Sequence, residues 1–287
     1  MQSSNLDLLQ RILAFLKHPT SEGAEQQSVL FVFKQLLTLI SWLYVLVFPV
    51  AIAITLLLKL LNYDGVNAVN ELAMNGEFWE VLFLGVVLAP LIEEITFRLP
   101  LRYHRAYLLL SSFMVIRIIV VFFLRQSFPN LAQTSLMAGV IPLVLTTGVY
   151  FLLRLERVEK RVINFYTNRF PLLFYTATIL FGLMHITNYS NVQNIVLIVL
   201  LLCIPQLIVG SILGFIRIRY GFAYALLMHA IYNGILLVPS SLVKAPTTPQ
   251  SAQVAGIFGL LILCFLGYGI VTLGSASYKL MALKKVS

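Results

Sequence analysis

Long apolar runs separated by short polar stretches dominate this chain of 287 residues. A helix needs about 20 mostly apolar residues to cross the hydrocarbon core of a bilayer, because each residue advances it by about 1.5 Å. About eight runs are long enough, near residues 32–61, 78–97, 107–124, 133–153, 171–188, 194–215, 222–239 and 252–275. The pattern predicts an all-α, polytopic integral membrane bundle of about eight transmembrane helices.

The first 28 residues follow a different pattern. Leucines recur at helical spacing, at Leu6, Leu9, Leu13 and Leu16, before a stop at Pro19. This segment lacks the basic, apolar and small-residue order of a cleaved signal peptide. We therefore expect residues 1–28 to form an amphipathic segment on the cytoplasmic membrane surface, followed by a transmembrane domain over residues 29–287.

Basic residues are unevenly divided between the two alternating sets of loops. One set, with the N-terminal segment, carries Arg11, Lys17, Arg102, Arg105, Arg154, Arg157, Lys160, Arg161, Arg217, Arg219, Lys279, Lys284 and Lys285, whereas residues 62–77, 189–193 and 240–251 on the other side hold one cation, Lys244. The positive-inside rule then predicts both termini in the cytoplasm, with the plasma or inner membrane as the location. The net charge of +9 needs no nucleic-acid partner, because these cations lie next to membrane lipids.

Composition agrees with this class: 60% of residues are hydrophobic and 11% are charged. Of eleven acidic residues, only Glu93 and Glu94 lie deep in a predicted span, and His185, His229 and Asn233 also fall within spans. Each such side chain costs about 2–3 kcal/mol near a bilayer centre, so a cluster of them indicates a functional interior.

Spacing assigns different roles to these groups. Glu94 and Arg98 are four residues apart, on one helix face, and are predicted to pair. Glu93 points about 100° away and is free to accept a proton from water as a general base. His229 and Asn233 are also four apart, so their donors can converge as an oxyanion hole, while His185 can help Glu93 to deprotonate a shared water.

Three motifs carry these residues in order: EEITFR, FGLMH and HAIYN. They match EExxxR, FxxxH and HxxxN, and the chain thereby resembles the intramembrane glutamic proteases of the CPBP or Abi family, which includes the type II CAAX prenyl proteases. The resemblance covers residues 93–233 and implies an intramembrane endopeptidase acting on a peptide or a lipidated protein. It implies catalytic roles for Glu93, His185, His229 and Asn233.

The resemblance further implies that Glu94 and Arg98 support the catalytic groups, and we expect Phe181 to serve in packing. No cofactor is expected. A zinc-dependent version of the same protease is the alternative, since two histidines and a glutamate can bind zinc. Against zinc stands the expectation that Glu94, already matched with Arg98, is not available to orient a histidine.

Arg117 lies near the middle of the third predicted span and has two open interpretations. It either pairs with Glu93 or Glu94, or receives the carboxylate of a substrate. Depth is a further difficulty. Counted along the chain at 1.5 Å per residue, Glu93 and His229 lie about 12–13 Å below the cytoplasmic loops, but His185 lies about 21 Å below.

Other classes of function remain as alternatives. A proton-coupled transporter would spread ionisable groups through the thickness of the membrane, whereas most of these lie toward one half. A non-catalytic membrane scaffold is also compatible with the sequence. The chain has no HExxH motif, and its only aspartates are Asp7 and Asp64, outside the spans, which argues against the other known kinds of membrane protease.

Overall fold

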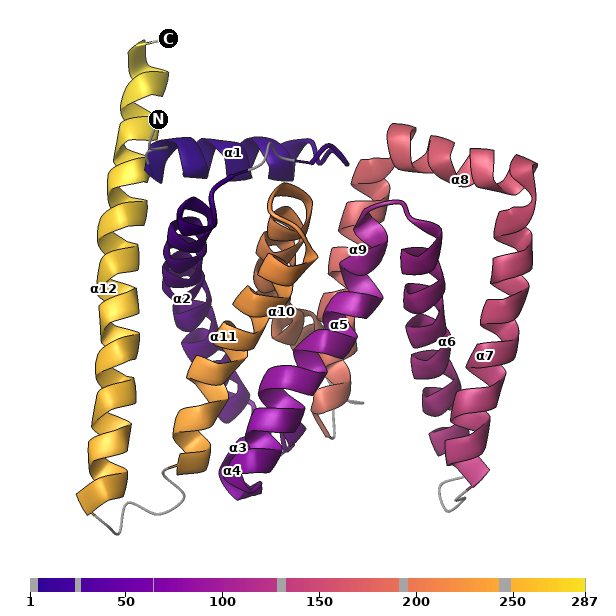
Figure 1. Ribbon diagram of the computed structural model, residues 1–287. Coiled ribbons are helices and arrows are strands. Elements are labelled where there is room, and N and C mark those ends of the chain that lie inside the picture. The colour runs from indigo at the N-terminus through magenta and orange to yellow at the C-terminus, as the bar shows by residue number, and fades with distance from the viewer. Residues whose placement is uncertain are drawn as a thin grey trace.

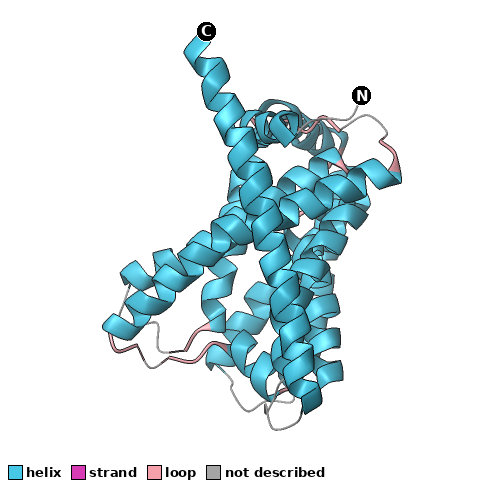
Figure 2. Cartoon of the chain, turned by 90° about the vertical axis from the view of Figure 1, so that its left-hand side faces the viewer, coloured by secondary structure: helices cyan, strands magenta, loops and turns pink. Residues whose placement is uncertain are grey.

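A computed structural model describes residues 5–23, 27–63, 65–127, 133–190, 196–242 and 249–286. These residues are helical apart from short loops at the two ends of the bundle, and contain no strand (Figures 1 and 2). A single isolated bridge pairs Asn67 with Tyr189 in two of those loops. The all-α prediction is confirmed.

In the described part of the chain, seven helices are long and apolar enough to cross a membrane. They are α2 (Val29–Leu60), α6 (Arg105–Ser127), α7 (Gln133–Arg154), α9 (Phe170–Met184) with the 3-10 turn η3 (His185–Asn188), α10 (Val196–Arg219), α11 (Phe222–Leu242) and α12 (Pro249–Val286). This architecture is that of a multi-pass integral membrane protein. Each helix overlaps one of the apolar runs from which it was predicted.

The remaining predicted span, residues 78–97, is helical throughout but is divided into three consecutive pieces. These are α4 (Phe78–Glu80), the π-helix η1 (Val81–Leu88) and α5 (Ala89–Phe97). Hydrogen bonds in a π-helix reach one residue further than in an α-helix, and such segments are frequent at functional sites. The apolar pattern predicted the span but carried no signal of its change in winding.

The N-terminal helix α1 (Asn5–Lys17) lies across one end of the bundle, and both termini lie at that end (Figure 1). Its buried residues are Leu8, Leu9, Ile12 and Phe15, whereas Leu13 is 47% exposed. Of the predicted leucines, Leu9 is therefore packed against the bundle and Leu13 is not, and contact of Leu13 with the membrane stays a prediction. Phe15 packs edge-on against Phe174 of α9 and Phe215 of α10, which places α1 in the same core as the transmembrane helices. The division at residue 28 stays a prediction.

Two short helices were not predicted. The loop between α7 and α9 forms α8 (Glu156–Asn168), which lies across the same end of the bundle as α1 (Figure 1). On its inner side, Glu159 accepts hydrogen bonds from Arg105 at 2.8 Å and Tyr103 at 2.7 Å. At the opposite end of the bundle, α3 (Ala68–Asn75) packs against α11 and η1.

Helix α10 forms the centre of the bundle and packs against α2, α9 and α11. Leu213, Phe215, Ile216 and Ile218 are completely buried there. At the opposite extreme is the hairpin of α6 and α7, which meets the rest of the bundle mainly through α5, α8 and the 3-10 turn η2 (Leu99–Leu101). The candidate site lies where α5 packs against α9 and α11.

Candidate functional site

Three separate segments bring one carboxylate and two imidazoles together. Glu93 lies on α5, His185 begins η3 at the end of α9, and His229 lies on α11. The Glu93 Oε2 atom is 3.8 Å from His185 Nε2 and 3.6 Å from His229 Nε2. The side chains of Glu93 and His185 are each 15% exposed and that of His229 is 3% exposed, so the cluster is nearly enclosed.

The carboxylate of Glu94 binds His229 through the ring nitrogen that does not face Glu93. Its Nδ1 atom lies 2.9 Å from Glu94 Oε1, and the same oxygen lies 3.6 Å from Arg98 Nε. Glu94 is fully buried and Arg98 is 2% exposed. The predicted pairing of Glu94 with Arg98 is present, but the expectation that this pairing makes Glu94 unavailable to a histidine is wrong, because one carboxylate oxygen serves both partners.

A backbone carbonyl fixes the orientation of His185. Its Nδ1 lies 2.8 Å from the carbonyl oxygen of Phe181, one helical turn earlier. A carbonyl only accepts hydrogen bonds, so Nδ1 carries a proton and Nε2 faces Glu93. When the ring is neutral, Nε2 presents a lone pair, and a carboxylate oxygen and an imidazole nitrogen then lie side by side as two hydrogen-bond acceptors.

Phe181 does more than fill space. The Arg98 guanidinium carbon lies 3.7 Å from the centre of its ring, and the ring also meets His185 and His229 edge-on. Neither Nη1 nor Nη2 of Arg98 has a hydrogen-bond partner among the described residues. The ring face therefore supplies electrostatic stabilisation to a buried cation. Packing was predicted for Phe181; this contact was not.

Gly210 of α10 makes room for that arrangement. A Cβ atom at this position would lie 2.9 Å from Phe181 and 3.2 Å from Nη2 of Arg98. One turn further along α10, a Cβ atom at Gly214 would lie 2.6 Å from Phe174. The GxxxG spacing of these glycines signals close helix packing in membranes, and here it brings α9 and the Arg98 guanidinium against α10.

Asn233 lies one turn after His229 on α11 and is anchored to the π-helix. Its Nδ2 donates a hydrogen bond of 3.0 Å to the carbonyl of Gly85. A Cβ atom at Gly85 would lie 2.7 Å from Leu237, so the glycine permits close approach of η1 to α11. The second hydrogen on Nδ2 is not used by this bond and is open to another acceptor.

Two arginines join the end of α5 to the end of α10, and sequence reasoning assigned no such role to them. Arg217 donates to the carbonyls of Arg98 at 2.9 Å and Leu99 at 3.2 Å. In the reverse direction, Arg102 donates to the carbonyl of Ile218 at 2.6 Å. Carbonyls in the last turn of a helix lack intrahelical partners, so each arginine caps the other helix. Arg217 is buried, which its position in the terminal sequence RIRY did not reveal.

Arg117 does not join the site. Its side chain is exposed on α6, and the ion pairs of Glu93 and Glu94 are with His185, His229 and Arg98. Pairing of Arg117 with either glutamate, one of its two interpretations, is therefore wrong. Its role toward a substrate carboxylate stays a prediction.

In the residues that the structure describes, no group of three or more His, Cys, Asp or Glu side chains is arranged to hold a metal ion. The nearest approach to such a group is the cluster of Glu93, His185 and His229. Both imidazoles have their Nδ1 atoms held, one by a carbonyl and one by a carboxylate, as in the outer shells of zinc sites. The same hydrogen bonds suit two histidines that orient water.

Comparison with known proteins provides no relative: no family model matches the chain, and neither a curated protein nor a solved structure matches it. Interpretation of the site therefore depends on its geometry and on the motifs in the sequence.

Proposed function

We propose that this chain is an intramembrane endopeptidase that hydrolyses peptide bonds by direct attack of water. The supporting observation is the convergence of Glu93, His185 and His229 from three segments into one nearly enclosed cluster. The resemblance of the three motifs to those of the intramembrane glutamic proteases supports the same activity. A peptide or a lipidated protein is the proposed substrate, cleaved near the cytoplasmic membrane surface.

The proposed base is the pair of acceptors, Glu93 Oε2 and His185 Nε2. A water molecule has two O–H bonds, and two acceptors 3.8 Å apart can each take one of them. The lone pair of the water then points toward the substrate. Glu93 takes one proton as the oxygen attacks the carbonyl carbon, and later passes that proton to the leaving amine when the C–N bond breaks.

The proposed oxyanion hole consists of His229 and Asn233. With Nδ1 protonated and donating to Glu94, the imidazole of His229 donates from Nε2 only as an imidazolium. The proposal therefore requires the imidazolium form of His229, whose Nε2–H would stabilise the developing negative charge. The open hydrogen on Asn233 Nδ2 supplies the second donor.

The zinc-dependent form is the second candidate, because both imidazoles are oriented through Nδ1 as zinc ligands usually are. Glu93, His185 and His229 would hold the ion, which would lower the pKa of a bound water. Chelation separates the two candidates. We expect cleavage to survive a zinc chelator; loss of activity that added zinc restores would establish the metal-dependent form.

The decisive test compares Glu93→Gln with Glu156→Gln in detergent-purified protein, using peptides and prenylated peptides as substrates. Glu156 is an exposed carboxylate on α8 and provides the matched control. We expect Glu93→Gln to slow cleavage by about 10²–10⁴-fold, the usual contribution of a general base. If the wild type cleaves none of these substrates, the scaffold and transporter alternatives replace the proposed protease activity. Proton flux in liposomes then distinguishes those two.

The proposed role of Arg117 has its own test. Cleavage rates of a free-acid peptide and of its C-terminal amide are compared in wild type and in Arg117→Ala. We expect the wild type to prefer the free acid and the variant to lose that preference, because the guanidinium pairs with carboxylates. The same preference in both proteins contradicts the role.

A further inference from the structure

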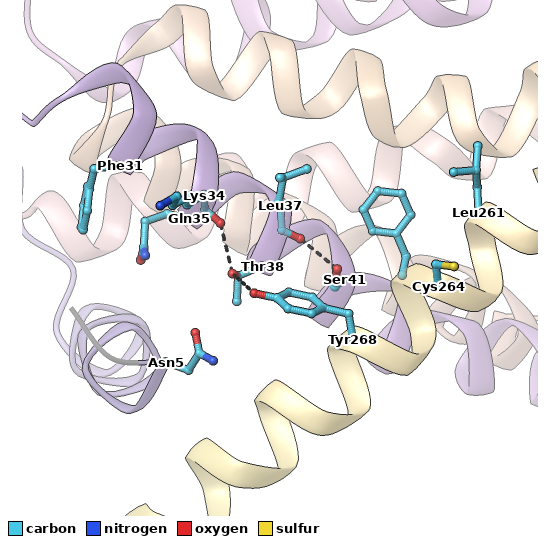
Figure 3. Close-up of a pocket in the computed structure, with 11 residues that line it drawn as sticks. Asn5, Phe31, Lys34, Gln35, Leu37, Thr38, Ser41, Leu261, Cys264 and Tyr268 are labelled. Atoms are coloured by element: carbon cyan, nitrogen blue, oxygen red, sulfur yellow. Dashed lines mark hydrogen bonds between the residues drawn. The ribbon is translucent and has the colours of Figure 1, made fainter. Parts of the chain in front are cut away.

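A pocket lies between α1, α2 and α12, away from the candidate site (Figure 3). Its volume of about 710 Å³ is within the range of pockets that bind small molecules and single lipid chains. The residues that line it come from both sides of the contact between α2 and α12, with Asn5 contributed by α1. None of the proposed catalytic residues is among them.

The lining mixes polar and apolar side chains, with Phe31 near the α1 end and Ser41 deeper along α2 (Figure 3). Lys34 of α2 is at the end near α1, and the hydroxyls of Thr38 and Tyr268 follow, 3.3 Å apart (Figure 3). Deeper along α12 the lining becomes apolar, with Phe265 and Leu261. A ligand of matching shape has a polar head toward Lys34 and a hydrocarbon tail between the helices.

Charge selects the kind of head group. Of the described residues that line the pocket, none is acidic, and Lys34 brings a positive charge. A second cation lies close by, since Arg11 of α1 donates a hydrogen bond to Gln35 in the lining. Basic groups at the end of a transmembrane helix attract anionic lipid head groups, each contributing about 1 kcal/mol. Thr38 already donates its hydroxyl proton to the carbonyl of Lys34, so the hydroxyls of Thr38 and Tyr268 add polarity to this part of the pocket and the cations bind the phosphate oxygens.

We propose that this pocket binds an anionic phospholipid, with its phosphate on Lys34 and one acyl chain between α2 and α12. The lipid would join α1 to the pair formed by α2 and α12, because residues of all three helices line the pocket. This site is separate from the proposed catalytic cluster and does not depend on its activity.

Cys264 provides a built-in reporter, because it lines the pocket and is exposed, whereas Cys203 is buried. The full chain in dodecyl maltoside micelles is treated with N-ethylmaleimide in the presence of phosphatidylglycerol or phosphatidylcholine. Peptide mass spectrometry then gives the modification rate of Cys264. We expect phosphatidylglycerol to slow it at least fivefold relative to phosphatidylcholine. Equal rates with the two lipids would overturn the proposal.

Two lysine variants on α2 test whether Lys34 is the group that recognises the anionic lipid. Lys34→Gln is expected to reduce the difference between the lipids to less than twofold. Lys59→Gln removes an exposed lysine at the other end of α2 and is expected to keep the wild-type difference. Loss of the difference in both variants would indicate bulk electrostatics and reject a specific site. Protection by glycerol 3-phosphate alone would reject the lipid in favour of a free phosphate.

Discussion

The centre of the bundle and the α6–α7 hairpin are both built from apolar helices, yet they differ in what surrounds them. In α10, 61% of the most apolar 18-residue window is buried inside the protein, whereas in α6 the corresponding share is 6%. Buried polar side chains follow this difference: Arg217 of α10 is enclosed and bonded, whereas Arg117 of α6 is exposed. Apolar composition determines that both helices lie in the membrane, whereas packing between helices determines where a charged side chain can be buried.

Removing a charge from the central network is expected to have the largest effect. Glu94→Gln leaves the buried Arg98 without its paired anion and replaces the carboxylate that accepts from His229 Nδ1 by a neutral amide. Breaking a buried ion pair costs about 3–5 kcal/mol, and losing a carboxylate behind a functional histidine costs about 10–100-fold in activity. Thermal unfolding in detergent and peptide cleavage measure the two effects. The exposed control, Glu156→Gln, is expected to change neither, and equal stability of the two variants contradicts the network.

A pair of glycine substitutions is expected to give opposite signs in the two regions. Gly210→Ala on α10 forces Phe181 and Arg98 away and should destabilise the protein by about 1–3 kcal/mol. Gly148→Ala on α7 meets nothing within 4 Å and should stabilise it by up to about 1 kcal/mol, through helix propensity alone. Thermal unfolding of both variants tests the contrast, which fails if the signs agree.

The arginine that caps α5 is expected to have a smaller effect. Arg217→Lys keeps the charge but loses the fork that reaches two carbonyls, those of Arg98 and Leu99, at a cost of about 1–2 kcal/mol. Arg154→Lys on α7 is the control, because that guanidinium is exposed and lies against Tyr150. Denaturation midpoints are the measurement. A control as unstable as Arg217→Lys would show that burial of Arg217 contributes nothing.

The smallest expected effect is at the contact between Glu159 of α8 and the start of α6. Hydrogen bonds from Arg105 and Tyr103 lower the pKa of the Glu159 carboxyl below its ordinary value. A lowered pKa means that the stabilisation is present above the ordinary value, near pH 4.3, and is lost as the pH falls through the lower, folded value. The protection factors of the α8 amides against hydrogen exchange should therefore fall in that acidic range. Glu159→Gln should remove this dependence, whereas Glu156→Gln should retain it.

Periodicity and motif spacing predicted much of this molecule. The apolar runs predicted the seven long helices and the position of the eighth helical stretch, since hydrophobic length is a local property of the chain. The pairing of Glu94 with Arg98 was predictable for the same reason, because a spacing of four residues fixes the relative positions of two side chains on one helix.

The depth of His185 was not predictable by counting residues. Counting residues placed His185 about 8 Å deeper than Glu93 and His229, but that count holds only for untilted helices that start in one plane. Several helices of the bundle are tilted relative to α12 (Figure 1), and the histidine comes within 3.8 Å of Glu93. Tilt changes depth without changing the sequence of any single helix.

By itself, the sequence determined the all-α membrane class, the approximate bounds of the spans and the polar side chains that lie within them. Only the tertiary structure decided that Glu94 holds His229, that Phe181 and Gly210 accommodate Arg98, and that Arg117 stays outside the cluster. The physical reason is range. Hydrophobic length and helical spacing act over a few turns of one chain segment, whereas a buried charge is stabilised by groups from several helices whose contacts no local pattern records.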